Sequence, residues 1–100
     1  MDVTEVRVYL VSNEERLKAY ATITIDNAFL IRDLRIIHGN TGLFVAMPSR
    51  KMKDGTFKDI AHPLNSETRQ LIEQKVLSEY ERELANPTKQ GQPAKESEQK

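Results

Sequence analysis

The chain has 100 residues and no cysteine, and its 15 basic side chains balance 15 acidic ones at neutral pH. The lack of cysteine excludes disulfides, thiol catalysis and zinc fingers, and no apolar run resembles a signal peptide or a membrane-spanning helix. We therefore expect one small cytoplasmic domain that is not a general nucleic-acid coat, although a neutral chain can still carry local charged patches.

Alternating apolar and polar side chains predict a β-hairpin at the start of the chain. In residues 3–11, VTEVRVYLV, the side chains of Val6, Val8 and Leu10 share one face, which is the period of a half-buried strand. Residues 17–25, LKAYATITI, resume the alternation after a short polar link. Their predicted apolar face consists of Leu17, Ala19, Ala21, Ile23 and Ile25. Two such runs joined by a short turn indicate a hairpin.

A third strand is predicted over residues 29–37, FLIRDLRII, after a turn at residues 26–28. Arg32 and Asp33 interrupt its apolar pattern, which indicates a bulge or an edge. The glycine-rich turn HGNTG then leads into residues 43–47, LFVAM, an unbroken apolar run typical of a strand covered on both faces. Because one helix covers only one face of a sheet, a second subunit is a candidate for the other cover.

A stretch rich in positive charge follows at residues 46–63, AMPSRKMKDGTFKDIAHP. Its four cations, set against two acids, are Arg50, Lys51, Lys53 and Lys58. The Asp54-Gly55 pair stands where a tight hairpin needs a positive φ. Residues 57–61 are then predicted as a fifth, short strand, which ends before Pro63 because proline has no amide hydrogen to donate.

The last predicted element is a helix that runs from about residue 66 to Asn86-Pro87, a pair that ends helices. Asn65 or Ser66 is suited to cap its first turn. Leu71 lies off the apolar stripe, either as a single exposed leucine or as part of another interface. The stripe recurs every fourth residue, at Ile72, Val76, Tyr80 and Leu84, with Leu77 beside it.

Together these elements predict an α+β fold, with a four- to five-stranded antiparallel sheet followed by one C-terminal helix packed on it. We assign residues 1–85 to a single domain. Residues 86–100 are predicted to form a disordered polar tail, because they contain no large apolar side chain. A folded part this short has a modest core, so dimerisation would supplement its stability.

The candidates for catalytic or metal chemistry are two histidines, His38 and His62. Each stands at the end of a predicted strand, where the simpler interpretation is a polar side chain with a local hydrogen bond. Their spacing with Asp59 matches no known metal-ligand pattern, and no acid–base pair or activated nucleophile is visible. We therefore expect a protein that is not an enzyme and needs no cofactor, metal or small-molecule substrate.

The basic stretch has two interpretations. Its cations keep an exposed hairpin soluble and unpaired, or they hold the phosphates of a nucleic acid, with twice as many in a dimer. Gln70 and Gln74 lie one turn apart opposite the apolar stripe, where they suit adenine edges or are ordinary surface glutamines. Arg69 falls within the stripe and can rest its stem on the sheet. The predicted nucleic-acid contacts are Arg50, Lys51, Lys53, Lys58, Arg69, Gln70 and Gln74.

Several segments resemble the stage V sporulation protein G family, SpoVG. They are VTEVRVYLV, ITIDNAFLIRDLRIIHGNTG, and GLFVAMPSRK followed by DGTFKDIAHPLNS and the helix, which together span residues 1 to about 85. The resemblance implies a small cytoplasmic bacterial homodimer that binds DNA, and in some members RNA, and that is tied to sporulation and septation. The family's nucleic-acid contacts match Arg50 and Lys51 here, with Arg69 and Gln70 on the helix.

From the residues and the resemblance we expect a small dimeric regulator that binds DNA or RNA and influences septation, cell division or sporulation-type gene programmes. The alternative is a protein-interaction module that acts on the septation machinery without touching nucleic acid. In that case the sheet edge or Leu71 would be its docking surface. Neither hypothesis involves a membrane.

Overall fold

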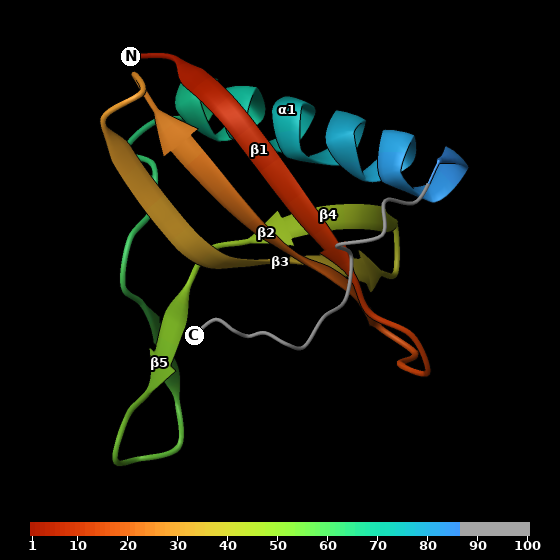
Figure 1. The fold of residues 1–100 in the computed structure, drawn as a ribbon. Helices are drawn as coiled ribbons and strands as arrows, with labels where there is room; N and C mark the ends of the chain where they lie inside the picture. The colour runs from red at the N-terminus through yellow and green to blue at the C-terminus, as the bar shows by residue number, and fades with distance from the viewer. Residues whose placement is uncertain (87–100) are drawn as a thin grey trace.

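Residues 1–86 fold into two sheets and one helix, which confirms the predicted α+β class (Figure 1). The computed structural model describes residues 1–86, so the predicted tail lies outside the described residues except for Asn86. In chain order the elements are β1 (Val3–Leu10), β2 (Leu17–Ile25), β3 (Phe29–Gly39), β4 (Gly42–Ala46), β5 (Ser49–Lys51), β6 (Phe57–Asp59) and α1 (Ser66–Ala85).

The four longer strands form one antiparallel sheet in the order β1-β2-β3-β4, whereas β5 and β6 pair with each other in a separate two-stranded sheet. The predicted fifth strand therefore does not join the main sheet, and it ends at Asp59 rather than at Ala61. Pro48, which is buried just after β4, explains the break. It has no amide hydrogen with which to continue the ladder.

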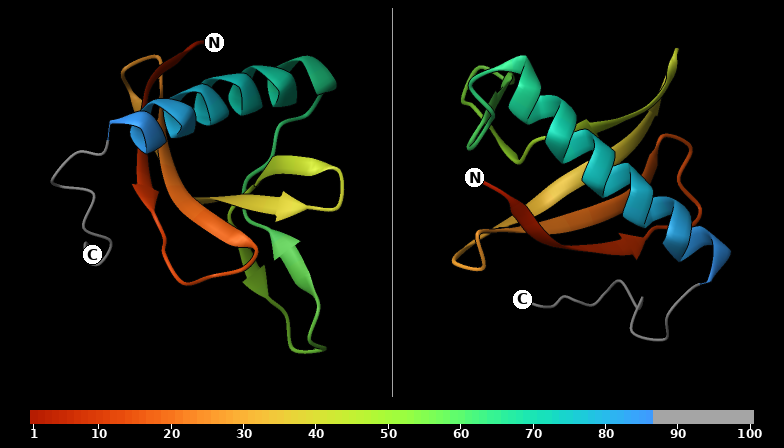
Figure 2. Two further views of the ribbon diagram at one scale, coloured as in Figure 1. Left: turned by 90° about the vertical axis from the view of Figure 1, so that its right-hand side faces the viewer. Right: turned by 90° about the horizontal axis from the view of Figure 1, so that it is seen from above.

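The helix α1 lies across one face of the main sheet and packs against β1, β2 and β4 (Figure 2). The hydrophobic core fills the space between them. Its most deeply buried large side chains are Ile23, Leu34, Ile36, Val45 and Val76. Removing such side chains from water is the main term that stabilises a domain of this size.

The irregularity predicted at Arg32 and Asp33 is a bulge in β3. Residues 21–23 of β2 stand opposite the longer segment from Ile31 to Leu34, so β3 holds one extra residue there. Asp33 has a φ of +66°, a conformation that aspartate tolerates better than most residues. The extra residue lets both ends of the segment face the core, with Leu34 buried and Ile31 packed against it.

A second register shift, between Leu17 and Ala19, moves Leu17 off the predicted core face. Leu17 stands opposite Ile37, and Ile37 stands opposite Phe44 of β4. The prediction that Leu17 shares the face of Ala19 is wrong, because a bulge reverses the alternation beyond it. Leu17 and Ile37 are half-buried and Phe44 is 40% exposed. We call these three residues the outer apolar strip, since they lie on the sheet face away from α1.

Asn65 caps α1, with its Oδ1 accepting a hydrogen bond from the Thr68 amide at 2.8 Å. The buried helix residues are Ile72, Val76, Tyr80 and Glu83. The predicted stripe thus fails at its last position: Leu84 is 54% exposed, because at 100° per residue it lies about 120° around the helix from Ile72. Leu71 is partly buried against the core, so it is not a single exposed leucine.

The strand β4 is an edge strand with one covered face. Val45 is buried in the core, whereas Leu43 and Phe44 are exposed. The unbroken apolar run at residues 43–47 predicted that both faces of this strand are covered. Residues 1–86 cover only the face that packs against α1. Within the same residues, no helix has the length and apolar character needed to cross a bilayer.

Candidate nucleic-acid interface

The predicted basic hairpin is present as β5 and β6, and it projects from the main sheet away from α1 (Figures 1 and 2). In its register Arg50 stands opposite Lys58, and Lys51 stands opposite Phe57. Directly opposed residues share a face and successive residues alternate, so the first pair lies on one face of the hairpin and the second on the other. Lys53 belongs to the turn that joins the strands. The cations therefore surround the hairpin instead of lining one side.

Backbone and side-chain hydrogen bonds close the turn at the tip. The Met52 amide donates to the Thr56 carbonyl at 2.7 Å, and Gly55 has the positive φ, +91°, that the turn needs. Asp54 Oδ1 accepts hydrogen bonds from the hydroxyl and the amide of Thr56, at 2.7 and 3.0 Å. These bonds hold the pKa of the Asp54 carboxyl below its ordinary value. The tip carboxylate thus serves the turn and does not pair with a neighbouring lysine.

The four hairpin cations are exposed and have no carboxylate partner among the described residues. Arg7–Glu5 and Arg82–Glu79 are ion pairs within residues 1–86, and neither involves the hairpin. Like charges that stand directly opposite each other across two strands are destabilising, and Arg50 and Lys58 are such a pair. The positive potential of the hairpin is therefore available to an external anion.

A fifth cation, not among the residues predicted from the sequence, lies at the base of the hairpin. Arg35 of β3 donates from Nη2 to Ser49 Oγ at 3.3 Å. The same base is fixed by the Ile60 amide, which donates to the Pro48 carbonyl at 2.7 Å. The alternation of β3 signals that Arg35 faces away from the core, but only the three-dimensional structure brings it next to β5.

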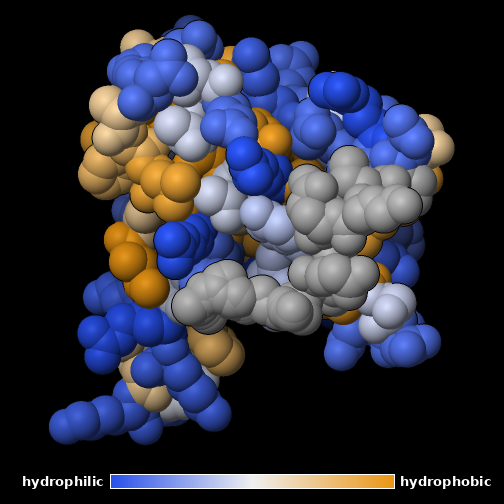
Figure 3. Space-filling model, viewed as in Figure 1, coloured by the Kyte–Doolittle hydropathy of each residue, from blue (hydrophilic) through white to orange (hydrophobic). Residues whose placement is uncertain are grey.

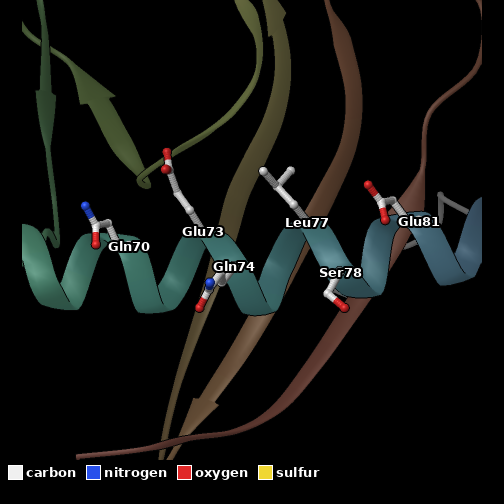
Figure 4. A pocket seen from close by; sticks show the side chains of 6 residues that line it. All are labelled: Gln70, Glu73, Gln74, Leu77, Ser78 and Glu81. Atoms are coloured by element: carbon white, nitrogen blue, oxygen red, sulfur yellow. The ribbon is translucent and has the colours of Figure 1, made fainter.

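The helix residues predicted to bind nucleic acid lie apart from the hairpin. Arg69, Gln70 and Gln74 are exposed on α1, and the hairpin projects in the opposite direction (Figure 2). A shallow groove on α1 is lined by Gln70, Glu73, Gln74, Leu77, Ser78 and Glu81 (Figure 4). Its two carboxylates repel phosphate. The structure thus brings the hairpin cations together but does not bring the helix residues to them.

Glu73 has a second role at the free edge of β4. Its Oε2 accepts a hydrogen bond from the Val45 amide at 3.4 Å. An edge strand presents unpaired amides and carbonyls that can pair with another chain. The Glu73 side chain occupies one of these amides, which makes this edge a weaker docking surface for an added strand.

The hydropathy of the surface sets the hairpin apart from its surroundings. In Figure 3 the projecting hairpin is a largely hydrophilic tip, and apolar surface gathers above it on the same side of the view. The connection between β6 and α1 contributes two exposed apolar side chains, Ile60 and Leu64. Phe57 is the exposed aromatic side chain of the hairpin itself.

The histidines show no arrangement typical of a metal site. His62 Nδ1 lies 3.0 Å from the Pro63 carbonyl oxygen, a local contact within the connection between β6 and α1, so His62 does not stand at a strand end as predicted. Within residues 1–86, no three side chains of His, Cys, Asp or Glu gather as metal ligands would.

Comparison with known proteins agrees with the resemblance seen in the sequence. The family model SpoVG matches residues 1–82. The chain is 68% identical over 84 residues to a relative from Anaeromyxobacter sp. (strain K), covering 84% of this chain and 82% of the relative. It is 62% identical to one from Myxococcus xanthus (strain DK1622), covering 84% of each. It is 56% identical over 82 residues to one from Geobacillus thermodenitrificans (strain NG80-2), covering 82% and 85%. All three are named as septation proteins SpoVG, and the chain belongs to the SpoVG family.

Proposed function

We propose that the protein is a dimeric regulator that binds DNA or RNA through the β5–β6 hairpin. The main support is the pair formed by Arg50 and Lys58, which are exposed, directly opposed and without a carboxylate partner in residues 1–86. Such a pair destabilises the free hairpin. A phosphate chain that contacts both cations replaces their repulsion with attraction, and Lys51 and Lys53 add to it.

Binding of this kind depends steeply on salt, because each phosphate that is neutralised releases a counterion. A dimer in which six to eight hairpin cations contact duplex DNA would show log K falling with log salt at a slope of roughly −5 to −7. Binding is then strong in dilute buffer and weak near physiological salt. A nucleic acid would contact Arg69, Gln70 and Gln74 only if it extended from the hairpin to α1. We therefore expect these three residues to contribute less to affinity than the hairpin cations do.

A double substitution tests the hairpin directly. Arg50→Gln/Lys58→Gln should weaken binding of a labelled oligonucleotide in fluorescence anisotropy and make the salt slope shallower by about 2–4 units per dimer. The matched control is Arg16→Gln/Arg32→Gln, which removes the same charge from exposed positions outside the hairpin. The control should follow the wild type. Unchanged affinity and slope in the hairpin variant would refute the proposal.

The dimer is proposed to form over the outer apolar strip, because this face of the sheet has no cover from residues 1–86. Phe44, the most exposed of the three strip residues, is the position to change. Phe44→Lys should convert the dimer to a monomer in sedimentation velocity at equal protein concentration. Phe29→Lys, at another exposed phenylalanine, is the control and should leave the dimer intact. A Phe44→Lys variant that sediments as the wild type does would contradict this placement.

The names of the relatives support a role in septation, and we propose that nucleic-acid binding serves it through a gene programme. The alternative is a protein-interaction module, which the exposed Ile60 and Leu64 favour. A variant with all four hairpin cations changed to glutamine separates the two. If it still captures division proteins and has lost nucleic-acid binding, the alternative is supported. If it loses both, nucleic acid mediates the association.

A further inference from the structure

The hairpin carries an aromatic side chain whose position has no structural explanation in the folded chain. Phe57 is 68% exposed and lies in a three-residue strand outside the core. Its cross-strand neighbour is Lys51, and the next residue is Lys58. An exposed phenylalanine on a small polar hairpin adds no packing energy to the fold, so its contribution is to be sought in a complex.

Basic side chains interleaved with an exposed aromatic ring suit unpaired nucleotides. Every base has a π-face that can stack on an aromatic ring, but in a duplex both faces are already covered by neighbouring bases. Because a base and its own phosphate are joined through a single sugar, the cation that holds the phosphate must lie close to the ring. Lys51 satisfies this condition, since directly opposed residues have Cβ atoms about 4.5–5.5 Å apart.

We propose that Phe57 stacks on an unpaired base, and that the hairpin therefore takes single-stranded nucleic acid, or the loop of a folded one, in preference to a duplex. This inference rests on the proposed function, since it names the class of nucleic acid bound at the same site. Phe57 supplies the stacking surface, while Lys51, Lys53 and the Arg50–Lys58 pair hold the backbone on either side of it.

Alanine substitution separates stacking from charge. Phe57→Ala should weaken binding of a mixed-sequence single strand by about 5- to 150-fold, the range expected for one stacked base. Phe57→Ala and the wild type should have equal affinity for the duplex formed by this strand and its complement. The salt slope should not change, because no cation is removed. Phe29→Ala, which removes another exposed phenylalanine at the start of β3, is the matched control and should bind both probes as the wild type does.

Tryptophan gives a direct optical readout. The chain contains no tryptophan, so Phe57→Trp introduces a single fluorophore at the proposed contact. Its emission should be that of an exposed indole in the free protein and should be quenched when the single strand binds. Phe29→Trp, at a position that is 64% exposed, should show no quenching with the same probe.

The possible failures are distinguishable. A wild type that binds neither probe in a salt-dependent manner would overturn the proposed function and this inference together. A wild type that binds while Phe57→Ala loses nothing on the single strand, or loses equally on both probes, would overturn the stacking inference alone. Blue-shifted emission from dilute free Phe57→Trp would also overturn it, since another protein surface would then cover the ring.

Discussion

Removing one charge from the hairpin should have opposite effects on stability and on binding. Arg50→Gln leaves Lys58 without a like-charged neighbour across the strands. Two unit charges 5–10 Å apart in water repel each other by about 0.4–0.8 kcal/mol before screening. At 0.15 M ionic strength, with a Debye length of about 8 Å, this falls to about 0.1–0.4 kcal/mol. The variant hairpin should therefore be more stable, most clearly in low salt, while its affinity for nucleic acid is lower.

Amide hydrogen exchange measures the first effect. The amides of Met52 and Ile60 donate the hydrogen bonds that close the tip and the base of the hairpin, each at 2.7 Å. In low salt they should exchange about 2–4 times more slowly in Arg50→Gln, and the difference should shrink as salt is added. Lys51→Gln is the control, because Lys51 faces Phe57 and no cation.

Binding of an oligonucleotide by the same samples measures the second effect. Arg50→Gln should bind the oligonucleotide more weakly than the wild type in fluorescence anisotropy. Arg50→Lys keeps the charge, so its amide hydrogen exchange should resemble that of the wild type. Faster exchange in Arg50→Gln, or a difference that does not respond to salt, would show that the two cations do not repel each other. The argument that the hairpin holds uncompensated charge for an external anion would then be wrong.

Three further predictions concern the scaffold and the tip. Val76→Ala should lower the free energy of unfolding by about 2–3 kcal/mol in urea titrations, because Val76 is fully buried, whereas Leu84→Ala at an exposed position should change it by less than about 0.5 kcal/mol. Asn65→Ala should cost about 1 kcal/mol through the lost bond to the Thr68 amide, and Asn65→Ser should recover most of it. The pKa of Asp54 in the folded state lies below its ordinary 3.8. The ionised Asp54 should therefore stabilise the turn fully well above pH 3.8, and this stabilisation should be lost as the pH falls through the folded-state pKa. The NMR signal of the Thr56 amide should report this loss in an acid titration, and Asp54→Asn should abolish the pH dependence.

The features predicted correctly from the sequence depend on residues that are close along the chain. The Asn65 cap needs an amide three residues later. The turn at Asp54-Gly55 needs one residue with a positive φ, and the bulge needs two polar residues, Arg32 and Asp33, in an apolar run. Features of this kind depend on residues a few positions apart in the sequence, so they can be predicted without the tertiary structure.

The features that were missed depend on register or rotation between distant segments. Leu17 left the core face because β2 shifts its pairing with β3 at that point, and nothing in LKAYATITI marks the shift. Leu84 is exposed because a strict four-residue repeat drifts around a helix of 3.6 residues per turn. Arg35 joins the base of the hairpin only through its contact with Ser49, 14 positions away.

The separation of the hairpin from the core has a functional consequence. Met47 and Pro48 are buried and anchor its base, whereas every residue from Arg50 to Ile60 is exposed. A core transmits the strain of a substitution because it is closely packed, but an exposed tip does not. The charge and the aromatic surface of this hairpin can therefore change without a loss of folding stability. For that reason, substitutions at the tip that abolish binding should leave the urea midpoint of the domain unchanged, and the assays above measure recognition instead of misfolding.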